Sequence, residues 1–395
     1  MKNILLMTLM AAAIIFMIAG CEQFSATYQR IDDAEFRLLD FIFEPADASP
    51  GDTVALTAVF AGKKADDLDK YIDWSISFNV VRDLLFGAAT VIDSMPLEKV
   101  ANKQIYASHP YWPNAQAVAF RIPIPKDIMR NSPQIPDRWT DILPPSVADA
   151  IPAEFASMTK NQIIDTLESF LENPNGVLDG SGLSAQNADY LPRLLQIFSV
   201  PIRVAAKINE PGRLPHAVHS YQTIRYNRSL SEKAGIRGIP VNYNPYIDSI
   251  VAYKVEGENI SGEISGLKRT TTRLCINCDN VIKIEGGYTY FLRAFSDSRT
   301  DSSLTTSGGE RVEEKHYSYW QFQLDGNEAG SVHHSGYMDI GTDIGSGNIN
   351  KLTPPSDKRI TKFTLWVTVK DEVIGELNRP EASALAEVSG RFEYK

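Results

Sequence analysis

Apolar and polar residues alternate along much of this chain, and turn residues interrupt the alternation at short intervals. Within residues 36–61, an apolar segment leads to a turn at Pro50-Gly51 and then to a run from Val54 to Phe60 whose side chains alternate between two faces. A period of two residues is typical of a strand with one buried face. Residues 36–61 therefore predict two strands joined by a turn.

The same order of segments recurs in the second half of the chain. A strand pattern begins at Tyr246, and Gly286-Gly287 later takes the place that Pro50-Gly51 has in the first half. The aromatic run from Tyr288 to Phe295 follows these glycines as the first alternating run follows its turn. A repeated order of elements indicates two copies of one structural unit.

The tryptophans and the last strands extend this repeat. Trp74 and Trp320 each lie in a short alternating segment, which is typical of a central strand whose ring packs between two sheets. Each half ends with an alternating strand, a proline-containing loop and a last strand that finishes at Tyr226 or Tyr394. We therefore predict a mainly β protein of two tandem sandwiches, residues 36–230 and residues 238–395, the second with long loops.

A different pattern interrupts the first predicted sandwich at about residues 127–198. A proline-rich connection leads to a segment with apolar residues at helical spacing, and Ser157 or Thr159 is suited to cap this helix. A second short helix is expected near Leu191 to Ile197. The first helix is expected to bury Ile163, Ile164, Leu167, Phe170 and Leu171. We predict a small α-helical insertion here.

Three segments resemble the immunoglobulin-like and PKD-like modules of bacterial surface proteins. "PGDTVALTA" resembles their second strand, "YWQFQLDG" their tryptophan strand and "FTLWVTVKDEVIGE" their penultimate strand. The resemblance implies tandem immunoglobulin-like β-sandwiches that serve as spacers, adhesive units or carbohydrate-binding neighbours of enzymes, and it implies no catalytic residues. The Gly-Asp-Gly turn that often follows the tryptophan strand is absent, and both copies exceed the typical length of about 100 residues.

The first residues of the chain form a separate signal. The apolar run over residues 4–19 follows Lys2, is too short to span a bilayer comfortably, and ends in Ala19-Gly20-Cys21. This ending resembles the lipobox of bacterial lipoproteins. The resemblance implies removal of residues 1–20, acylation of Cys21 and a tether over residues 21–35; the alternative is an uncleaved anchor helix. Acyl chains on Cys21 would hold the protein on a membrane without a spanning helix.

The net charge narrows the partners. A formal charge of −10 disfavours binding to nucleic acid and to anionic lipid headgroups. Any membrane anchoring would therefore depend on the acyl chains on Cys21. Glu22 is not the aspartate that retains some lipoproteins in the inner membrane, so the lipoprotein resemblance favours the outer membrane and leaves the leaflet open. The expected partners are a glycan or another cell-envelope protein.

Cys275 and Cys278 are the remaining cysteines. Their surroundings predict strand, turn and strand, which favours a short-range disulfide or a pair of thiols over a redox motif. A zinc site would need two further ligands, and His216 with His219 has a suitable spacing but lies in the other predicted sandwich. We expect no metal and no cofactor.

Catalytic motifs are absent from the sequence: it has no nucleophile elbow, zincin motif, phosphate loop or dinucleotide fingerprint. We expect a non-enzymatic, lipid-anchored, exported protein that acts as a surface recognition or spacer module. One alternative is a carbohydrate-binding lipoprotein with Tyr319, Trp320 and Tyr337 as ligand-facing aromatic residues. Others are a periplasm-facing assembly partner and a glycan-active hydrolase, which would need convergent carboxylates in a cleft between the sandwich and the insertion.

Overall fold

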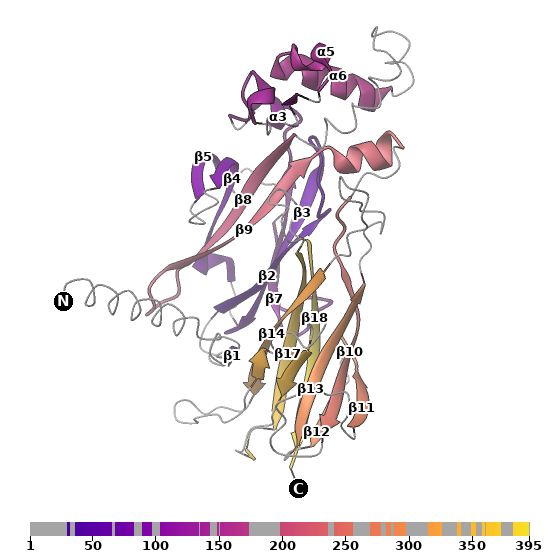
Figure 1. Cartoon of the computed structure of the whole chain (residues 1–395). Coiled ribbons are helices and arrows are strands. Elements are labelled where there is room, and N and C mark those ends of the chain that lie inside the picture. Colours follow the sequence, from indigo (N-terminus) through magenta and orange to yellow (C-terminus); the bar gives the residue numbers. More distant parts are fainter. Residues whose placement is uncertain are drawn as a thin grey trace, which may run out of the picture.

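The computed structural model shows a mainly β chain whose described residues form four sheets and a few short helices (Figure 1). No helix within this described part of the chain has both the length and the apolar composition needed to cross a membrane. The structure describes residues 30–31, 36–64, 68–82, 89–96, 103–133, 135–142, 148–149, 151–173, 198–235, 241–255, 269–277, 282–285, 288–297, 315–325, 338–340, 349–352, 358–359, 361–372 and 382–394.

The first pair of sheets comes from the first half of the chain. Its elements are β2 (Phe36–Glu44), β3 (Thr53–Gly62), η1 (Leu68–Tyr71, a 3-10 helix), β4 (Ile72–Arg82), β5 (Ala89–Pro96), β6 (Gln104–Tyr106), β7 (Gln116–Pro123), β8 (Ser199–Ile208) and β9 (His216–Arg225). One sheet has the order β2-β3-β7-β6, and the other has the order β5-β4-β8-β9. Neighbouring strands are antiparallel throughout. We call this pair the first sandwich.

The second sandwich is formed mostly by the second half. Its strands are β10 (Tyr246–Val255), β11 (Arg269–Leu274), β12 (Ile282–Glu285), β13 (Thr289–Asp297), β14 (Lys315–Asp325), β15 (Met338–Ile340), β16 (Ile349–Leu352), β17 (Lys362–Glu372) and β18 (Ala382–Glu393), joined by β1 (Arg30–Ile31). The sheet orders are β11-β10-β13-β16-β15 and β1-β14-β17-β18-β12. Only the two edge pairs of the second sheet, β1 with β14 and β12 with β18, are parallel among these described strands.

The order of strands repeats between the sandwiches. The series β2-β3-β7-β6 corresponds to β10-β13-β16-β15, and β4-β8-β9 corresponds to β14-β17-β18. In both sandwiches the segment before the second matched strand pairs in parallel with the last strand, through Ala48 with Ile224 in the first and through β12 in the second. The repeat in the sequence therefore has a counterpart in the topology.

Alternation along the strands builds the core of the first sandwich. Val54, Leu56, Ala58 and Phe60 point from β3 into this core. The Trp74 ring comes from the opposite sheet and meets Phe41, Phe60 and Phe120 edge-on at centroid distances of 6.5, 6.2 and 5.4 Å. Edge-on aromatic pairs add to the stabilisation from buried area, and they confirm the predicted place of Trp74 between two sheets.

The second sandwich has its own core. Trp320 is 3% exposed and belongs to this core, as the sequence predicts for a tryptophan on a central strand. The Phe363 and Phe392 rings stack at 4.7 Å. Gly390 makes room for them, because a Cβ at this position would lie 2.0 Å from the Phe363 ring.

Helices lie between β7 and β8, at the end of the first sandwich far from the second (Figure 1). They are α3 (Ile128–Asn131), η3 (Trp139–Ile142), α5 (Ala153–Ala156) and α6 (Lys160–Glu172). Thr159 caps α6 in a reciprocal capping box with Gln162, which satisfies two backbone donors at the helix start. The predicted apolar face is buried in the first core, with Leu171 partly buried. The second predicted helix, near Leu191 to Ile197, lies outside the described residues.

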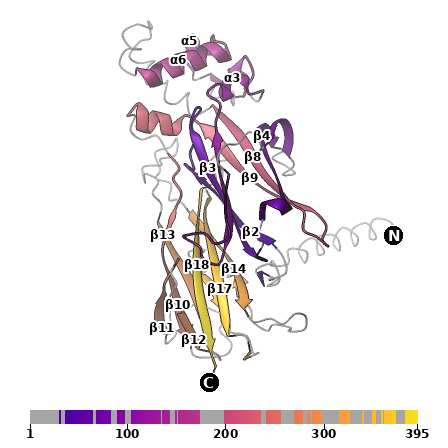
Figure 2. The same ribbon diagram turned by 180° about the vertical axis from the view of Figure 1, so that it is seen from behind.

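The two sandwiches meet through the outer faces of two sheets, at a contact that we call the waist. β18 and β2 lie side by side there in both views (Figures 1 and 2). The apolar part of the waist consists of Ile31, Leu39, Val59, Ala61, Trp112, Ala115, Trp366 and Leu385. Val59 and Ala61 alternate out of phase with the first core, so their burial reflects the second sandwich covering this face.

Glu387 on β18 connects the sandwiches by hydrogen bonds. Its carboxylate accepts from the Asn114 side chain at 2.6 Å, from the Asn114 backbone N–H at 3.2 Å and from Trp366 Nε1 at 3.1 Å. Its backbone exchanges two bonds of 2.8 Å with Asn277. Burial raises the pKa of Glu387, whereas the bonds from Asn114 and Trp366 favour its charged form.

Further polar contacts surround this centre. Trp112 Nε1 donates to the Leu385 carbonyl at 2.9 Å. The buried Asp40 carboxylate lies 3.3 Å from Lys370 Nζ on the other sandwich. Its Oδ2 atom has no hydrogen-bond partner within the described structure. A buried charge with incomplete pairing opposes stability, and burial accordingly raises the pKa of Asp40 despite the nearby Lys370.

β1 corrects the expectation of a tether over residues 21–35. Arg30 and Ile31 pair in parallel with Phe322 and Gln323 of β14. Ile31 is 2% exposed and belongs to the waist, because an apolar side chain gains by leaving water. The rest of the expected tether, Cys21 included, lies outside the described residues.

We expect Trp112→Ala to lower the free energy of unfolding by about 3–5 kcal/mol, because it removes a buried indole and its bond to Leu385. Since this side chain joins two separate cores, calorimetry should show two transitions in place of one. The neighbouring Tyr111→Ala is the matched control, because Tyr111 is 67% exposed and its loss should change stability by less than about 0.5 kcal/mol. Equal effects of the two substitutions would contradict this account of the waist.

The Asp40→Asn variant tests the buried carboxylate. The pKa of Asp40 is raised above its ordinary value of 3.8 in the folded protein, so the folded state binds this proton more readily than the unfolded chain. Protonation of Asp40 therefore stabilises the folded state. This stabilisation is complete below the ordinary pKa of Asp40 and is lost as the pH rises through its pKa in the folded protein. The wild type should therefore gain stability relative to Asp40→Asn between about pH 7 and about pH 4. Urea titrations at several pH values measure this difference, and a constant value would contradict the assignment.

Candidate functional site

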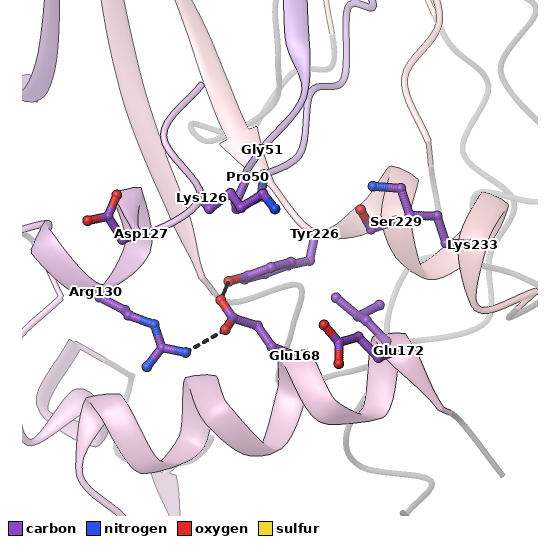
Figure 3. Close-up of a pocket in the computed structure, with 11 residues that line it drawn as sticks. Pro50, Gly51, Lys126, Asp127, Arg130, Glu168, Glu172, Tyr226, Ser229 and Lys233 are labelled. Carbon is purple, nitrogen blue, oxygen red and sulfur yellow. Dashed lines mark hydrogen bonds and ion pairs between the residues drawn. The ribbon is translucent and has the colours of Figure 1, made fainter. Parts of the chain in front are cut away.

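A pocket of about 340 Å³ lies between the helical insertion and the end of the first sandwich (Figure 3). Four segments form it: the turn between β2 and β3, the start of the insertion, α6, and the residues after β9, including the short π-helix η4 (Ser229–Lys233). The lining residues are Pro50, Gly51, Lys126, Asp127, Arg130, Glu168, Leu171, Glu172, Tyr226, Ser229 and Lys233. The segments are far apart in sequence and meet only in the folded chain.

Glu168 on α6 holds three of these segments together. It accepts a charge-assisted bond from Arg130, which also pairs with Asp165 at 2.6 Å. It accepts a second bond from the Tyr226 hydroxyl at 3.3 Å. Charge-assisted bonds are stronger than neutral ones. Glu168 therefore fixes α6 against both α3 and the end of β9.

Tyr226 forms part of the inner wall. Its ring is 2% exposed and belongs to the first core, while its hydroxyl reaches Glu168 (Figure 3). Burial, together with the Glu168 charge, raises the pKa of Tyr226 well above its usual value of 10. The hydroxyl consequently stays protonated and acts as a donor at physiological pH.

The neighbour of Tyr226 in sequence helps to fix this wall. Arg225 forms a buried ion pair with Asp47, with Nη2 2.7 Å from Oδ2. The same Asp47 oxygen accepts from the Asn242 backbone N–H at 3.0 Å. A buried pair with additional hydrogen bonds is far less costly than an unpaired charge. The pair joins the end of β9 to the segment that follows β2.

Gly51 shapes the opposite edge of the pocket. Its φ of 83° lies in the left-handed region that suits glycine, and its N–H donates to the Ile124 carbonyl at 3.2 Å. A Cβ at Gly51 would stand 3.0 Å from Cγ of Lys126. The absence of a side chain therefore lets the Lys126 stem lie against the turn.

The sequence-predicted site residues are not brought together. Trp320 lies in the second core, so its prediction as a ligand-facing residue is wrong: its ring is covered by apolar neighbours. Tyr319 points to the other face of β14 and is 44% exposed. Cys275 is disulfide-bonded. Cys21, Cys278 and Tyr337 lie outside the described residues, and the acylation of Cys21 stays a prediction.

Within the described part of the chain, no group of three or more His, Cys, Asp or Glu side chains is placed to hold a metal ion. The positions of the candidate zinc ligands also argue against a zinc site. His216 and His219 lie on β9 of the first sandwich, whereas Cys275 follows β11 of the second and is already bonded to another sulfur.

The structure also contains an aromatic loop between β6 and β7 that the sequence did not predict. His109 stacks on Trp112 at a centroid distance of 4.4 Å and meets Tyr106 edge-on at 4.9 Å, while Tyr111 stands exposed beside them. The Trp112 ring is held by its bond to Leu385. The segment "SHPYWPNA" is the only signal for this loop, because its two prolines and three aromatic rings are unusual between strands.

We expect Tyr226→Phe to lower the free energy of unfolding by about 1 kcal/mol, because a buried hydroxyl loses its bond to a carboxylate. Tyr243→Phe is the matched control: its hydroxyl donates to Glu232 at 3.1 Å on the exposed surface, where the loss should be smaller. Denaturant unfolding of both variants measures the difference. A larger effect at Tyr243 would contradict the role given to Tyr226.

Comparisons with known proteins assign no family to this chain. No protein-family profile matches it, and no curated protein matches it. Among solved structures, it is compared with the three N-terminal domains of the Highly Immunogenic Outer Capsid protein (Hoc) of bacteriophage RB49. That match has 9% sequence identity and a TM-score of 0.19, and it covers 91% of this chain and 100% of the other. A TM-score of that size lends no support to a shared fold.

Proposed function

We propose that this protein is a lipid-anchored, exported, non-enzymatic recognition module. Its body is two joined sandwiches, and its binding site is the pocket beneath the helical insertion. The observation that carries the proposal is the position of this pocket: α3 and α6, which carry part of its lining, lie at the end of the first sandwich that points away from the waist (Figure 1). A site at one end of a stiff body is suited to meeting a ligand at a distance from the other end.

The strand order supports assigning both sandwiches to the immunoglobulin-like class. That class places its first, second, fifth and fourth strands in one sheet and its third, sixth and seventh in the other. Here β10-β13-β16-β15 and β14-β17-β18 follow this order, with β1, β11 and β12 as additions. The first sandwich has the same order, with β5 as an additional edge strand beside β4.

The waist supports a role in spacing. Interfaces between domains of one chain usually permit relative motion unless they are large and apolar. Here an apolar cluster with two buried tryptophans is combined with specific bonds to Glu387. Such a contact favours one relative orientation, so the two sandwiches act as a single spacer.

The lipobox-like sequence supports the membrane anchor and the envelope location. Acylation of Cys21 would attach the chain to a lipid surface, and Glu22 favours the outer membrane. The partner that the pocket meets is then a glycan, a peptide or another component of the cell envelope. The negative net charge argues against nucleic acid.

Two alternative functions, carbohydrate binding and hydrolysis, differ in the support that they have. The carbohydrate-binding alternative loses its predicted platform because Trp320 is in the core. A hydrolase needs carboxylates between the sandwich and the insertion, and the pocket holds Glu168, Glu172 and Asp127 there. Glu168, however, is paired with Arg130 and accepts from Tyr226. A carboxylate whose oxygens already accept bonds from a guanidinium and a hydroxyl is suited to binding rather than to donating a proton.

Fractionation of cells tests the anchor. We expect the wild type to sediment with outer-membrane vesicles and Cys21→Ser to appear in the soluble fraction, because the substitution removes the acylated thiol. Metabolic labelling with an alkyne fatty acid should mark the wild type alone. Ser25→Ala, four residues further on, is the matched control and should behave as the wild type. Labelled Cys21→Ser protein in the membrane would contradict the proposal.

A further inference from the structure

The pocket beneath the insertion contains two charged side chains that the described structure leaves without partners. Neither the Lys126 ammonium nor the Glu172 carboxylate has an ion pair or a hydrogen bond within the described part of the chain. The other charges of the lining are at least partly matched: Arg130 pairs with Glu168 and Asp165, and Asp127 accepts from Asn131 at 2.6 Å. Lys126 and Glu172 are therefore available to a ligand.

Apart from Asp127, which is bonded to Asn131, and Arg130, which is paired with Glu168, the charges of the pocket lie on two walls. Lys126 and Lys233 lie on the side of the sandwich, whereas Glu168 and Glu172 lie on α6 across from them (Figure 3). Glu168 and Glu172 are four residues apart, so they share one face of the helix. Lys233 has only a long contact of 3.6 Å to Asp52, on the same wall. The pocket thus offers a cationic side and an anionic side.

The space between the two walls is partly apolar. The Tyr226 ring lies between them (Figure 3), and Leu171 and Pro50 also line the pocket. Ligand sites commonly combine such apolar walls with a few directed polar groups. At about 30 Å³ for each water-sized group, the pocket holds roughly eleven non-hydrogen atoms. That is the size of a dipeptide of small residues.

We propose that the pocket binds a short zwitterionic peptide, with its carboxylate at Lys126 and Lys233 and its ammonium group at Glu172. This inference rests on the proposed recognition function and names its ligand class. A ligand with only an anion would leave Glu172 unpaired, and a ligand with only a cation would leave Lys126 unpaired, so either ligand would forgo one charge-assisted bond. A zwitterion satisfies both walls at once.

Calorimetric titration of the full chain in detergent tests the ligand class. The probes are L-Ala-L-Ala, its N-acetyl derivative and its C-terminal amide. We expect the free dipeptide to bind at least about tenfold more tightly than either blocked form, because each blocked end loses a charge-assisted bond. No binding of L-Ala-L-Ala up to about 10 mM, or equal binding of all three probes, would overturn the inference.

Two variants assign the ends of the ligand. Lys126→Met should weaken the preference for a free carboxylate, with Lys233 still present, and keep the preference for a free amine. Glu172→Gln should remove the preference for a free amine and keep the preference for a free carboxylate. Both positions are exposed, so the fold should persist, as circular dichroism can check. The matched control is Lys207→Met, at the exposed position of the otherwise mostly buried strand β8, and it should bind as the wild type does. Variants that keep both preferences would overturn the placement.

The same samples separate this inference from the proposed function. Mass spectrometry should recover the dipeptide intact after titration. Cleavage would overturn the non-enzymatic proposal and still support the ligand class. Failure of the dipeptide to bind would overturn the ligand class alone, because the membrane attachment of Cys21 is measured independently.

Discussion

The arrangement of the molecule depends on one buried carboxylate. Glu387 projects from the outer face of β18, where a strand of an isolated sandwich would meet water, and it accepts hydrogen bonds from both sandwiches. Its neighbours on this face, Ser383, Leu385 and Ser389, also contact the first sandwich or the segment that links the two. An apolar contact alone has no preferred direction. The geometry of these bonds fixes which way one sandwich faces the other, and hence where the pocket lies relative to the rest of the chain.

Carboxylates also connect the segments that form the pocket. Its walls come from segments whose apolar side chains share the first core, whereas most of the residues that line the pocket itself are charged. Glu168 joins α3, α6 and the end of β9, while Asp47 and Arg225 hold that end in place from behind. The paired charges, Glu168 with Arg130 and Asp47 with Arg225, hold the segments together. Lys126 and Glu172, which are unpaired within the described structure, are exposed. In both regions a small number of carboxylates connects elements that are far apart in the sequence.

The sequence predicted the interiors of the sandwiches well, because alternation with a period of two is a local signal. It placed Trp74 and Trp320 in cores and the cap of α6 at Thr159. It missed the waist, although apolar residues at outward positions, such as Trp366 between Leu365 and Val367, indicate that a face is covered. No local pattern says which surface covers it. A cleft between the sandwich and the insertion entered only with the hydrolase alternative, and its residues were missed for the same reason: Gly51, Glu168 and Tyr226 meet only after the strands and the insertion have packed.

The short strand β1 has a consequence for the order in which the chain assembles. Arg30 leaves the ribosome early, but its pairing partner Phe322 lies in the second sandwich, with most of the chain between them. Contacts between residues so distant in sequence form late, because the intervening chain must be ordered first. Ile31 also needs a completed waist to be buried. The strand β1 is thus synthesised early and secured last, after both sandwiches have formed.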